Sequence, residues 1–308
     1  MDNKIKKAFC FAVYPFLVSR EILDPQSRDI LDHIEICERD DLEYFTVPVM
    51  PFNKIIQEEV VVERKEKLGD MTFPVGVESL IGYNLLLRSW IYPIPFALRA
   101  IENIGGRNEL SLEDFQSTLF WPLHVLSEFT QRKVGIMPLA EVPARVNEYA
   151  LNGRVFIKTL EKLNHCHGSV MFIEDILASS TEGVPYITEK NKQVTKLSQE
   201  GKVILSEPVN FKTDNMGNLE YRTWVMNNNV LTISRYGFPD NTDIPKEIVE
   251  SVTKFTEVHK GKLPKHYVLD MGLSDRGVIL VEINDFMGAG NMTSETFKKV
   301  AAAYKTYD

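Results

Sequence analysis

Apolar residues in this chain form two kinds of pattern, which predict strands and helices. Runs of about four to eight residues rich in branched and aromatic side chains are typical of buried strands, whereas apolar residues at every third or fourth position indicate amphipathic helices. Strands are predicted at residues 7–18, 43–50, 154–160, 169–177, 203–211, 219–226, 230–237, 266–273 and 278–286. Helices are predicted at residues 25–38, 79–89, 111–116, 244–260 and 293–305, with a break at 92–95. This order predicts an α/β (α+β) protein whose first part alternates strand and helix.

Two β-hairpins are predicted in the second half of the chain. The first joins residues 219–226 to 230–237 through Asn227-Asn228-Asn229, and asparagine tolerates the positive φ that tight hairpin turns require. The second spans residues 266–286, with its turn near 274–277.

The pairing register of the second hairpin decides which polar residues share a face. A strict four-residue turn sets Asp270 opposite Val281. One extra residue in the turn, or a bulge at Gly272 or Gly277, sets Asp270 opposite Glu282 instead. We expect the second arrangement.

Polar residues interrupt the end of an otherwise apolar strand, VILVEINDF. Glu282 and Asn284 are two positions apart, so both point to the same face of the strand, which Asp270 shares in the expected register. Two carboxylates and an amide oxygen suit Mg²⁺, which proteins usually hold with one or two carboxylates plus substrate phosphates. Hydrogen-bonded polar residues at a strand end are the alternative reading.

Two cations and one acid stand out in the other predicted strands. Lys158 lies among apolar residues, where it suits a phosphate or, equally, reaches water from a sheet edge. Arg222 lies one hairpin away from the acidic residues and could neutralise a phosphoryl group. Glu207 lies where a strand leaves one lobe and enters another, so the backbone there could bind an adenine edge.

Composition narrows the class of protein. The formal charge of −8 over 308 residues argues against a broad nucleic-acid surface. Three cysteines without paired spacing predict reduced thiols in a cytoplasmic protein. The apolar start is interrupted by Pro15 and followed by charges, which favours a first core strand over a signal peptide. No apolar run approaches the roughly 20 residues that span a bilayer.

The order of these features resembles the ATP-grasp superfamily. It consists of a strand lysine (Lys158), a connector glutamate (Glu207), the hairpin motif Glu220-Tyr221-Arg222 and the final Asp270…Glu282-Ile283-Asn284. Glu220-Tyr221-Arg222 and PVGVE at Pro74–Glu78 are similar to a branch of ATP-grasp ligases found often in phages and bacteria.

This resemblance implies the ATP-grasp fold, in which two α+β lobes hold a nucleotide between them after a small α/β pre-grasp domain. The expected domains are a substrate domain at 1–145, an N-lobe at 146–205 and a C-lobe with the metal site at 206–308.

The resemblance also assigns roles to the metal and phosphate residues. It implies that Asp270, Glu282 and Asn284 hold Mg²⁺. Lys158 contacts the α- and β-phosphates of ATP, and Arg222 contacts the γ-phosphate or an acyl phosphate.

Further roles concern the base, the ribose and the loop over the phosphates. Glu207 and Val209 lie at the adenine, and Glu220 contacts the ribose or supports the neighbouring arginine. Many ATP-grasp proteins carry a second lysine and a glycine-rich loop, whereas EKLNHCHGS holds one glycine, Gly168. Lys162 is the candidate second lysine.

The implied function is ATP-dependent carboxylate–amine ligation through an acyl phosphate, which releases ADP and phosphate. The substrates are small-molecule, peptide or protein carboxylates and amines. A nucleotide-binding module without ligase activity and a phosphotransferase are the alternatives.

Other candidates carry less weight. His165 and His167 are too few for a structural zinc site, and Cys166 between them has no evident partner base. The aromatic stretch Arg88–Arg99 is read as packing, and the lysine-rich residues 189–202 as a solvated helix or lid.

A carboxylate substrate and a lid are placed by analogy with the fold. Arg20, Arg88 and Arg99 are the candidate carboxylate ligands in the N-terminal half, and residues 160–170 or 179–198 are the candidate lid.

Overall fold

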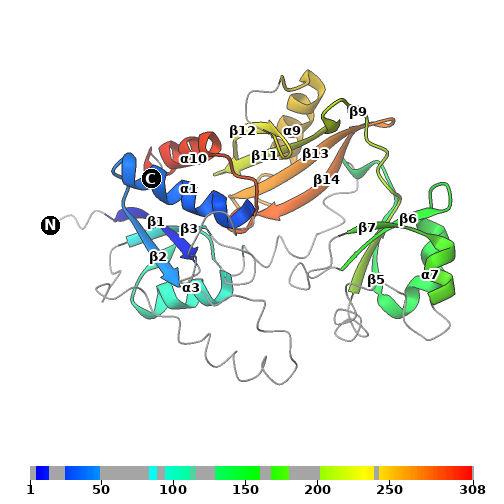
Figure 1. The fold of residues 1–308 in the computed structure, drawn as a ribbon, viewed down its shortest axis with the longest axis horizontal. Coiled ribbons are helices and arrows are strands. Elements are labelled where there is room, and N and C mark those ends of the chain that lie inside the picture. The colour runs from blue at the N-terminus through cyan, green and yellow to red at the C-terminus, as the bar shows by residue number, and fades with distance from the viewer. Residues whose placement is uncertain are drawn as a thin grey trace.

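The computed structural model describes residues 5–13, 25–48, 83–88, 94–111, 114, 129–159, 168–179, 202–238 and 243–306. These residues form three four-stranded sheets and a short two-stranded ribbon (Figure 1). Within these ranges, no helix is both long and apolar enough to cross a membrane.

The first sheet is parallel and is covered on both sides. Its strands, in spatial order, are β2 (Tyr44–Pro48), β1 (Lys6–Val13), β3 (Tyr83–Arg88) and β4 (Arg107–Asn108). Helix α1 (Pro25–Arg39) lies on one side and α3 (Ile94–Asn103) on the other (Figure 1). Leu85, Leu86 and Leu87 are all fully buried, which is why this strand is a continuous apolar run.

Two predictions in this region are wrong. In place of the predicted helix at 79–89, strand β3 occupies Tyr83–Arg88 and pairs with β1. In place of the predicted break at 92–95, α3 begins at Ile94, because proline is tolerated in the first turn of a helix. A short apolar run does not distinguish a buried strand from a buried helix, and here the parallel pairing partner decides.

The second sheet is antiparallel. Its strands, in spatial order, are β5 (Val134–Pro138), β8 (Lys202–Ser206), β6 (Arg154–Thr159) and β7 (Ser169–Phe172). Val155 and Ile157 pack with Val142 and Ile176 from the short helical segments on one face. The predicted strand at 169–177 is partly wrong, because it ends at Phe172 and α7 (Ile173–Ser179) follows.

The third sheet is made of the two predicted hairpins. Its strands, in spatial order, are β12 (Asn229–Arg235), β11 (Glu220–Met226), β13 (Tyr267–Ser274) and β14 (Gly277–Asp285). Asn227 and Asn228 adopt φ of 51° and 57°, which confirms the asparagine turn. Helix α9 (Lys246–His259) packs against this sheet, and β9 (Thr213–Asp214) pairs with β10 (Gly217–Asn218) beside it.

The C-terminal helix α10 (Ser294–Thr306) returns from the third sheet to the first and lies beside α1 (Figure 1). Phe297 stacks on His33 with ring centroids 4.2 Å apart. The Tyr304 hydroxyl donates to the backbone oxygen of Asn84 at 2.7 Å. One apolar core therefore joins residues of the first sheet, α10 and the third sheet.

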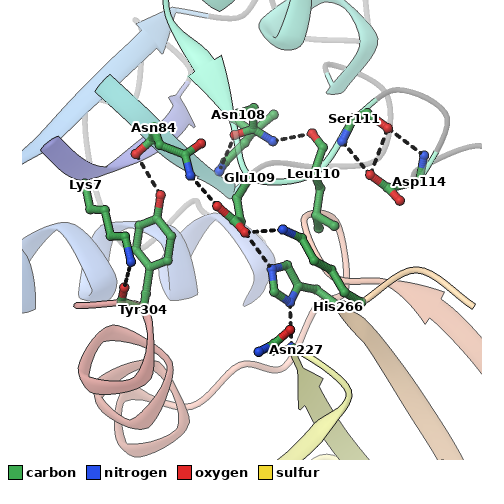
Figure 2. Close-up of polar contacts among 12 residues, drawn as sticks. Lys7, Asn84, Asn108, Glu109, Leu110, Ser111, Asp114, Asn227, His266 and Tyr304 are labelled. Carbon is green, nitrogen blue, oxygen red and sulfur yellow. Dashed lines mark hydrogen bonds and ion pairs between the residues drawn. The ribbon is translucent and has the colours of Figure 1, made fainter. Parts of the chain in front are cut away.

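A polar cluster around Glu109 also joins the first and third sheets (Figure 2). Its carboxylate accepts hydrogen bonds from Lys265 at 2.5 Å, from His266 at 3.4 Å and from Asn84. His266 Nδ1 in turn accepts from the backbone N–H of Asn227 at 2.9 Å, so Nε2 carries the proton that is donated to Glu109. Burial raises the pKa of Glu109, but the hydrogen bonds from His266 and Lys265 outweigh it and lower the pKa to about 2.

A second capping feature follows this cluster. The Ser111 hydroxyl accepts from the backbone N–H of Asp114 at 3.1 Å, and the Asp114 carboxylate accepts from the Ser111 N–H at 2.8 Å (Figure 2). This reciprocal pair confirms the predicted helix start at Ser111.

Candidate active site

The register of β13 and β14 brings the predicted metal ligands to one face. Asp270 pairs with Glu282, while Met271 pairs with Leu280, so Val281 is the extra residue of a bulge. The predicted pairing of Asp270 with Glu282 is therefore confirmed. Its predicted cause is wrong in place, because the bulge lies on β14 at Val281 and not at Gly272 or Gly277.

Arg222 and Asp270 form a buried, bidentate ion pair across β11 and β13. The Arg222 Nε and one terminal nitrogen donate to the two carboxylate oxygens at 2.8 and 2.6 Å. The other terminal nitrogen donates to the Gly290 carbonyl at 2.6 Å, and Asn284 Nδ2 donates to Asp270 at 3.0 Å. Burial lowers the pKa of Arg222, but the charge of Asp270 outweighs it and keeps the pKa above its usual value.

Lys158 and Glu282 join the second and third sheets. The Lys158 Nζ donates to the Glu282 carboxylate at 3.0 Å, and both side chains are mostly buried. Alternation along β6 places Lys158 on the face opposite Val155 and Ile157, which belong to the core of the second sheet. That face of the second sheet is therefore turned toward the carboxylates of the third.

Glu220 and Tyr236 complete the surroundings of Arg222. The guanidinium of Arg222 lies over the Tyr236 ring, 4.4 Å from its centroid. Glu220 lies on the same face of β11 as Arg222, two residues away. Burial, reinforced by the nearby charge of Asp270, raises the pKa of Glu220 to about 7. The cluster therefore holds a carboxyl group that changes charge near neutral pH.

The oxygen ligands on this face fit a magnesium ion. Asp270 and Glu282 supply carboxylates and Asn284 an amide, which is the hard-oxygen chemistry that Mg²⁺ prefers. The described residues hold no cluster of three or more histidine, cysteine or acidic side chains, so the site is short of a full protein cage. Such a partial set matches an ion that completes its shell with substrate phosphates and water.

An open pocket of about 590 Å³ lies at the other end of the same face of β6. Its lining includes Arg154, Phe172, Val209 and Arg276. Phe172 is 49% exposed, although it is a large aromatic side chain, and the Arg154 guanidinium lies 4.7 Å from its ring centroid. Val209 from the connector after β8 thus lines a cavity with an accessible apolar wall.

Glu207 is held by ion pairing beside this pocket. Its carboxylate accepts from Arg276 at 2.6 Å, and its backbone N–H donates to the carbonyl of Lys133 at 3.1 Å. The two segments that connect the second sheet to the rest of the chain therefore meet at Glu207, and both contact the turn between β13 and β14. Whether the backbone of this connector binds adenine stays a prediction.

The expected role of Arg88 as a ligand for a substrate carboxylate is not supported. Arg88 is 2% exposed, and its terminal nitrogens donate to the carbonyls of Phe286, Met287 and Ala289 at 2.6–3.1 Å. Burial lowers its pKa to about 10. Arg88 therefore holds the loop that follows β14. Arg99 is exposed on α3.

Several predicted residues lie outside the described part of the chain. They are Lys162, the His165-Cys166-His167 group, Arg20, Pro74–Glu78 and most of both candidate lids.

Two arginines at this site were not identified in the sequence. Arg132 donates to the carbonyls of Leu280 and Val281 at 2.9 and 3.3 Å, and Arg276 pairs with Glu207. Arg276 lies in a turn and Arg132 in a segment of uncertain order, so neither had the buried-cation signal that singled out Lys158 and Arg222.

The comparisons with known proteins agree on the fold. The chain aligns over 97% of its length, and over 94% of the other chain, with D-alanyl-alanine synthetase A from Vibrio cholerae O1 biovar eltor, at 12% identity and a TM-score of 0.56. A RimK domain ATP-grasp protein from Sphaerobacter thermophilus aligns over 97% and 98% of the two chains, at 12% identity and a TM-score of 0.55. The ATP-grasp ligase PsnB aligns over 98% and 97%, at 11% identity and a TM-score of 0.52.

At these identities the structures establish the ATP-grasp fold and nothing finer. No curated protein sequence matches the chain. A family model that describes an ATP-grasp domain, the second family of its clade, matches residues 129–302. This match covers more than half of the chain and contains all of the described site residues above except Arg88. The chain therefore belongs to the ATP-grasp family.

Proposed function

We propose that this protein is an ATP-dependent carboxylate–amine ligase, which forms an amide through an acyl phosphate and releases ADP and phosphate. The observation that carries the proposal is the set of charges between the second and third sheets. Lys158, Arg222, Asp270 and Glu282 lie within a chain of contacts of 2.6–3.0 Å. Cations and carboxylates in such proximity suit the phosphates of a nucleotide and the metal ion that accompanies them.

The pocket and the charged cluster are placed as the two ends of a nucleotide require. Arg154 at the pocket and Lys158 at the cluster lie on one face of β6, four residues or about 13 Å apart. The apolar wall formed by Phe172 and Val209 suits a base, whereas the cluster suits phosphates. ATP is the substrate that this arrangement supports best.

The proposed chemistry proceeds in two steps. A substrate carboxylate oxygen attacks the γ-phosphorus of ATP, the bond to the bridging oxygen breaks, and ADP leaves. An amine nitrogen then attacks the acyl carbon and loses a proton, and phosphate leaves with the electrons of the carbon–oxygen bond. Magnesium, held by Asp270, Glu282 and Asn284, would supply charge neutralisation at the phosphates.

The protein side chains contribute placement and charge. Lys158 binds phosphate oxygens as a point charge, and Arg222 presents a planar set of donors to the transferring phosphoryl group. Arg222 is fixed by Asp270, by Gly290 and by the Tyr236 ring, so little reorganisation is needed when negative charge develops beside it.

The class of substrate is proposed from the structural neighbours. One neighbour is a D-alanyl-alanine synthetase, and another is a ligase complexed with a variant of its minimal precursor, magnesium and ADP. We therefore propose an amino acid, a peptide or a protein end as the source of the carboxylate or the amine.

The test is to incubate the protein with ATP, Mg²⁺ and a mixture of amino acids and short peptides, and to identify products by mass spectrometry. We expect ADP, phosphate and a new amide, all of which disappear in Glu282→Ala. AMP in place of ADP would mean an adenylating mechanism and contradict the acyl phosphate. A stable phosphorylated substrate would indicate a phosphotransferase, and nucleotide binding without turnover of any acid or amine would indicate a binding module.

A further inference from the structure

The bulge at Val281 lies on the outer edge of the third sheet. β14 is the last strand in the order β12-β11-β13-β14, so the carbonyls on its outer side have no strand partner among the described residues. Three of them accept side-chain hydrogen bonds from two consecutive residues of the segment that enters the second sheet. Gln131 Nε2 donates to Val278 at 2.8 Å, and Arg132 donates to Leu280 and Val281.

The contacts of Arg132 are specific to the bulge. In a regular strand, successive carbonyls point to opposite edges, so one side chain does not reach two consecutive carbonyls. At the bulge, the carbonyls of Leu280 and Val281 both face the Arg132 guanidinium, at 2.9 and 3.3 Å. The planar guanidinium, with several donors in a fixed geometry, suits two neighbouring acceptors as an ammonium does not.

We infer that Arg132 is a positioning residue that stabilises the bulge and thereby keeps Glu282 and Asn284 on the same face as Asp270. The inference rests on the proposed function, because it gives those three residues their role as ligands of magnesium and its nucleotide.

The register explains why the bulge matters. The turn pairs Ser274 with Gly277, and regular pairing from there would set Val281 opposite Asp270. Glu282 would then turn toward the buried face that Leu280 and Ile283 now occupy. The inserted residue corrects this by one position. Because a bulge disrupts the ladder locally, its orphaned carbonyls need another donor.

The environment of Arg132 shows that its charge is used for this contact. Its Nε is buried without a hydrogen-bond partner in the described part of the chain, and its two terminal nitrogens donate to the bulge. Burial lowers its pKa to about 10, against the opposing charge of Glu207. Placing a cation here is costly, and the cost is offset by satisfying carbonyls that the neighbouring strand β13 does not reach.

Arg132 also links the bulge to the connection between the two sheets. The next residue, Lys133, accepts the backbone hydrogen bond from Glu207, which begins the connector on the return crossing. The side chain that holds the metal-site register therefore belongs to the same junction that carries the second sheet. The orientation of the second sheet and the geometry of the carboxylates are joined through one residue.

The test compares Arg132→Met and Arg132→Lys with the matched control Gln131→Ala. The control removes a hydrogen bond from the same segment to the same strand edge, but three residues away from the bulge. Hydrogen exchange of the nucleotide-free protein is followed in peptides covering residues 278–286. Binding of Mn²⁺ with ADP is measured by electron paramagnetic resonance, so that neither measurement depends on turnover.

We expect faster exchange at the bulge peptides in Arg132→Met and a loss of Mn²⁺–ADP affinity of about tenfold or more, as for other residues that orient metal ligands. Arg132→Lys should lie between this variant and wild type, and Gln131→Ala should stay within about twofold of wild type. If Arg132→Met does not fold, Arg132→Lys against Gln131→Ala makes the same comparison.

Wild-type exchange and wild-type Mn²⁺–ADP affinity in a folded Arg132 variant would overturn the inference, as would an equal effect of Gln131→Ala. Absence of Mn²⁺–ADP binding in the wild-type protein would instead contradict the proposed function. The exchange data would then still decide whether Arg132 holds the bulge.

Discussion

Lys158 on β6 donates a hydrogen bond of 3.0 Å to Glu282 on β14, and this contact joins the two sheets between which we place the nucleotide. A lysine and a carboxylate that pair with each other are also suited to separate roles when phosphates bind. The ammonium then has a phosphate as its partner, and the carboxylate has the metal ion.

Lys158→Met tests the first of these roles. We expect the affinity for ATP to fall about tenfold to a hundredfold, because a charge-assisted hydrogen bond contributes about 1.5–3 kcal/mol. Calorimetric titration with a non-hydrolysable ATP analogue measures the change. Lys202→Met, at the exposed start of β8, is the matched control and should bind as wild type does. Equal affinities in both variants would remove Lys158 from the phosphate site.

Arg222 and Asp270 offer a test of the buried pair. Arg222→Gln leaves a buried carboxylate without its bidentate partner, so we expect the free energy of unfolding to fall by about 3 kcal/mol. The double variant Arg222→Gln/Asp270→Asn removes both charges and should lose less than the sum of the two single variants. Urea denaturation measures all four proteins. Strict additivity would show that the pair is not coupled.

Glu109 predicts how stability depends on pH. Its pKa in the folded protein, about 2, lies below the ordinary value of 4.5, so its contribution is fully present above about pH 5 and is lost as the pH falls toward 2. We expect Glu109→Gln to lose on the order of 3 kcal/mol at pH 7 and to weaken the stability loss between pH 5 and 2. Urea denaturation at a series of pH values measures this. An unchanged slope in the variant would contradict the account of the Figure 2 cluster.

Arg88→Met tests the role of the loop after β14. Three carbonyls lose their donors, so we expect the free energy of unfolding to fall by about 3 kcal/mol. Arg99→Met on the exposed face of α3 is the control, with an expected change within about 0.5 kcal/mol. Thermal and urea unfolding measure both. A fully stable Arg88→Met variant would return Arg88 to the candidates for substrate binding.

The parts of the fold that were predicted correctly had local causes. Asparagine tolerates positive φ, which located the turn at Asn227 and Asn228. The spacing of Asp270, Glu282 and Asn284 required one extra residue in the hairpin, and that requirement predicted a bulge. The order of charged residues then pointed to the ATP-grasp family, which the family model confirms.

The errors had causes that lie far away in the sequence. The residues of β3 form a strand because β1 pairs with them, and nothing within the segment distinguishes that strand from a buried helix. The position of the bulge depends on Arg132, almost 150 residues before Val281. Arg88 holds a loop about 200 residues away, so no local pattern indicated its partners.

The central claim is that the carboxylates of β13 and β14 hold magnesium with ATP, and calorimetry of the non-hydrolysable ATP analogue tests it most directly. Titrations of wild type and Glu282→Gln are made with and without Mg²⁺, with Glu250→Gln on the exposed surface of α9 as the control. We expect Mg²⁺ to strengthen binding strongly in wild type and in the control, and to lose most of this effect in Glu282→Gln. Equal Mg²⁺ dependence in all three proteins would contradict the account.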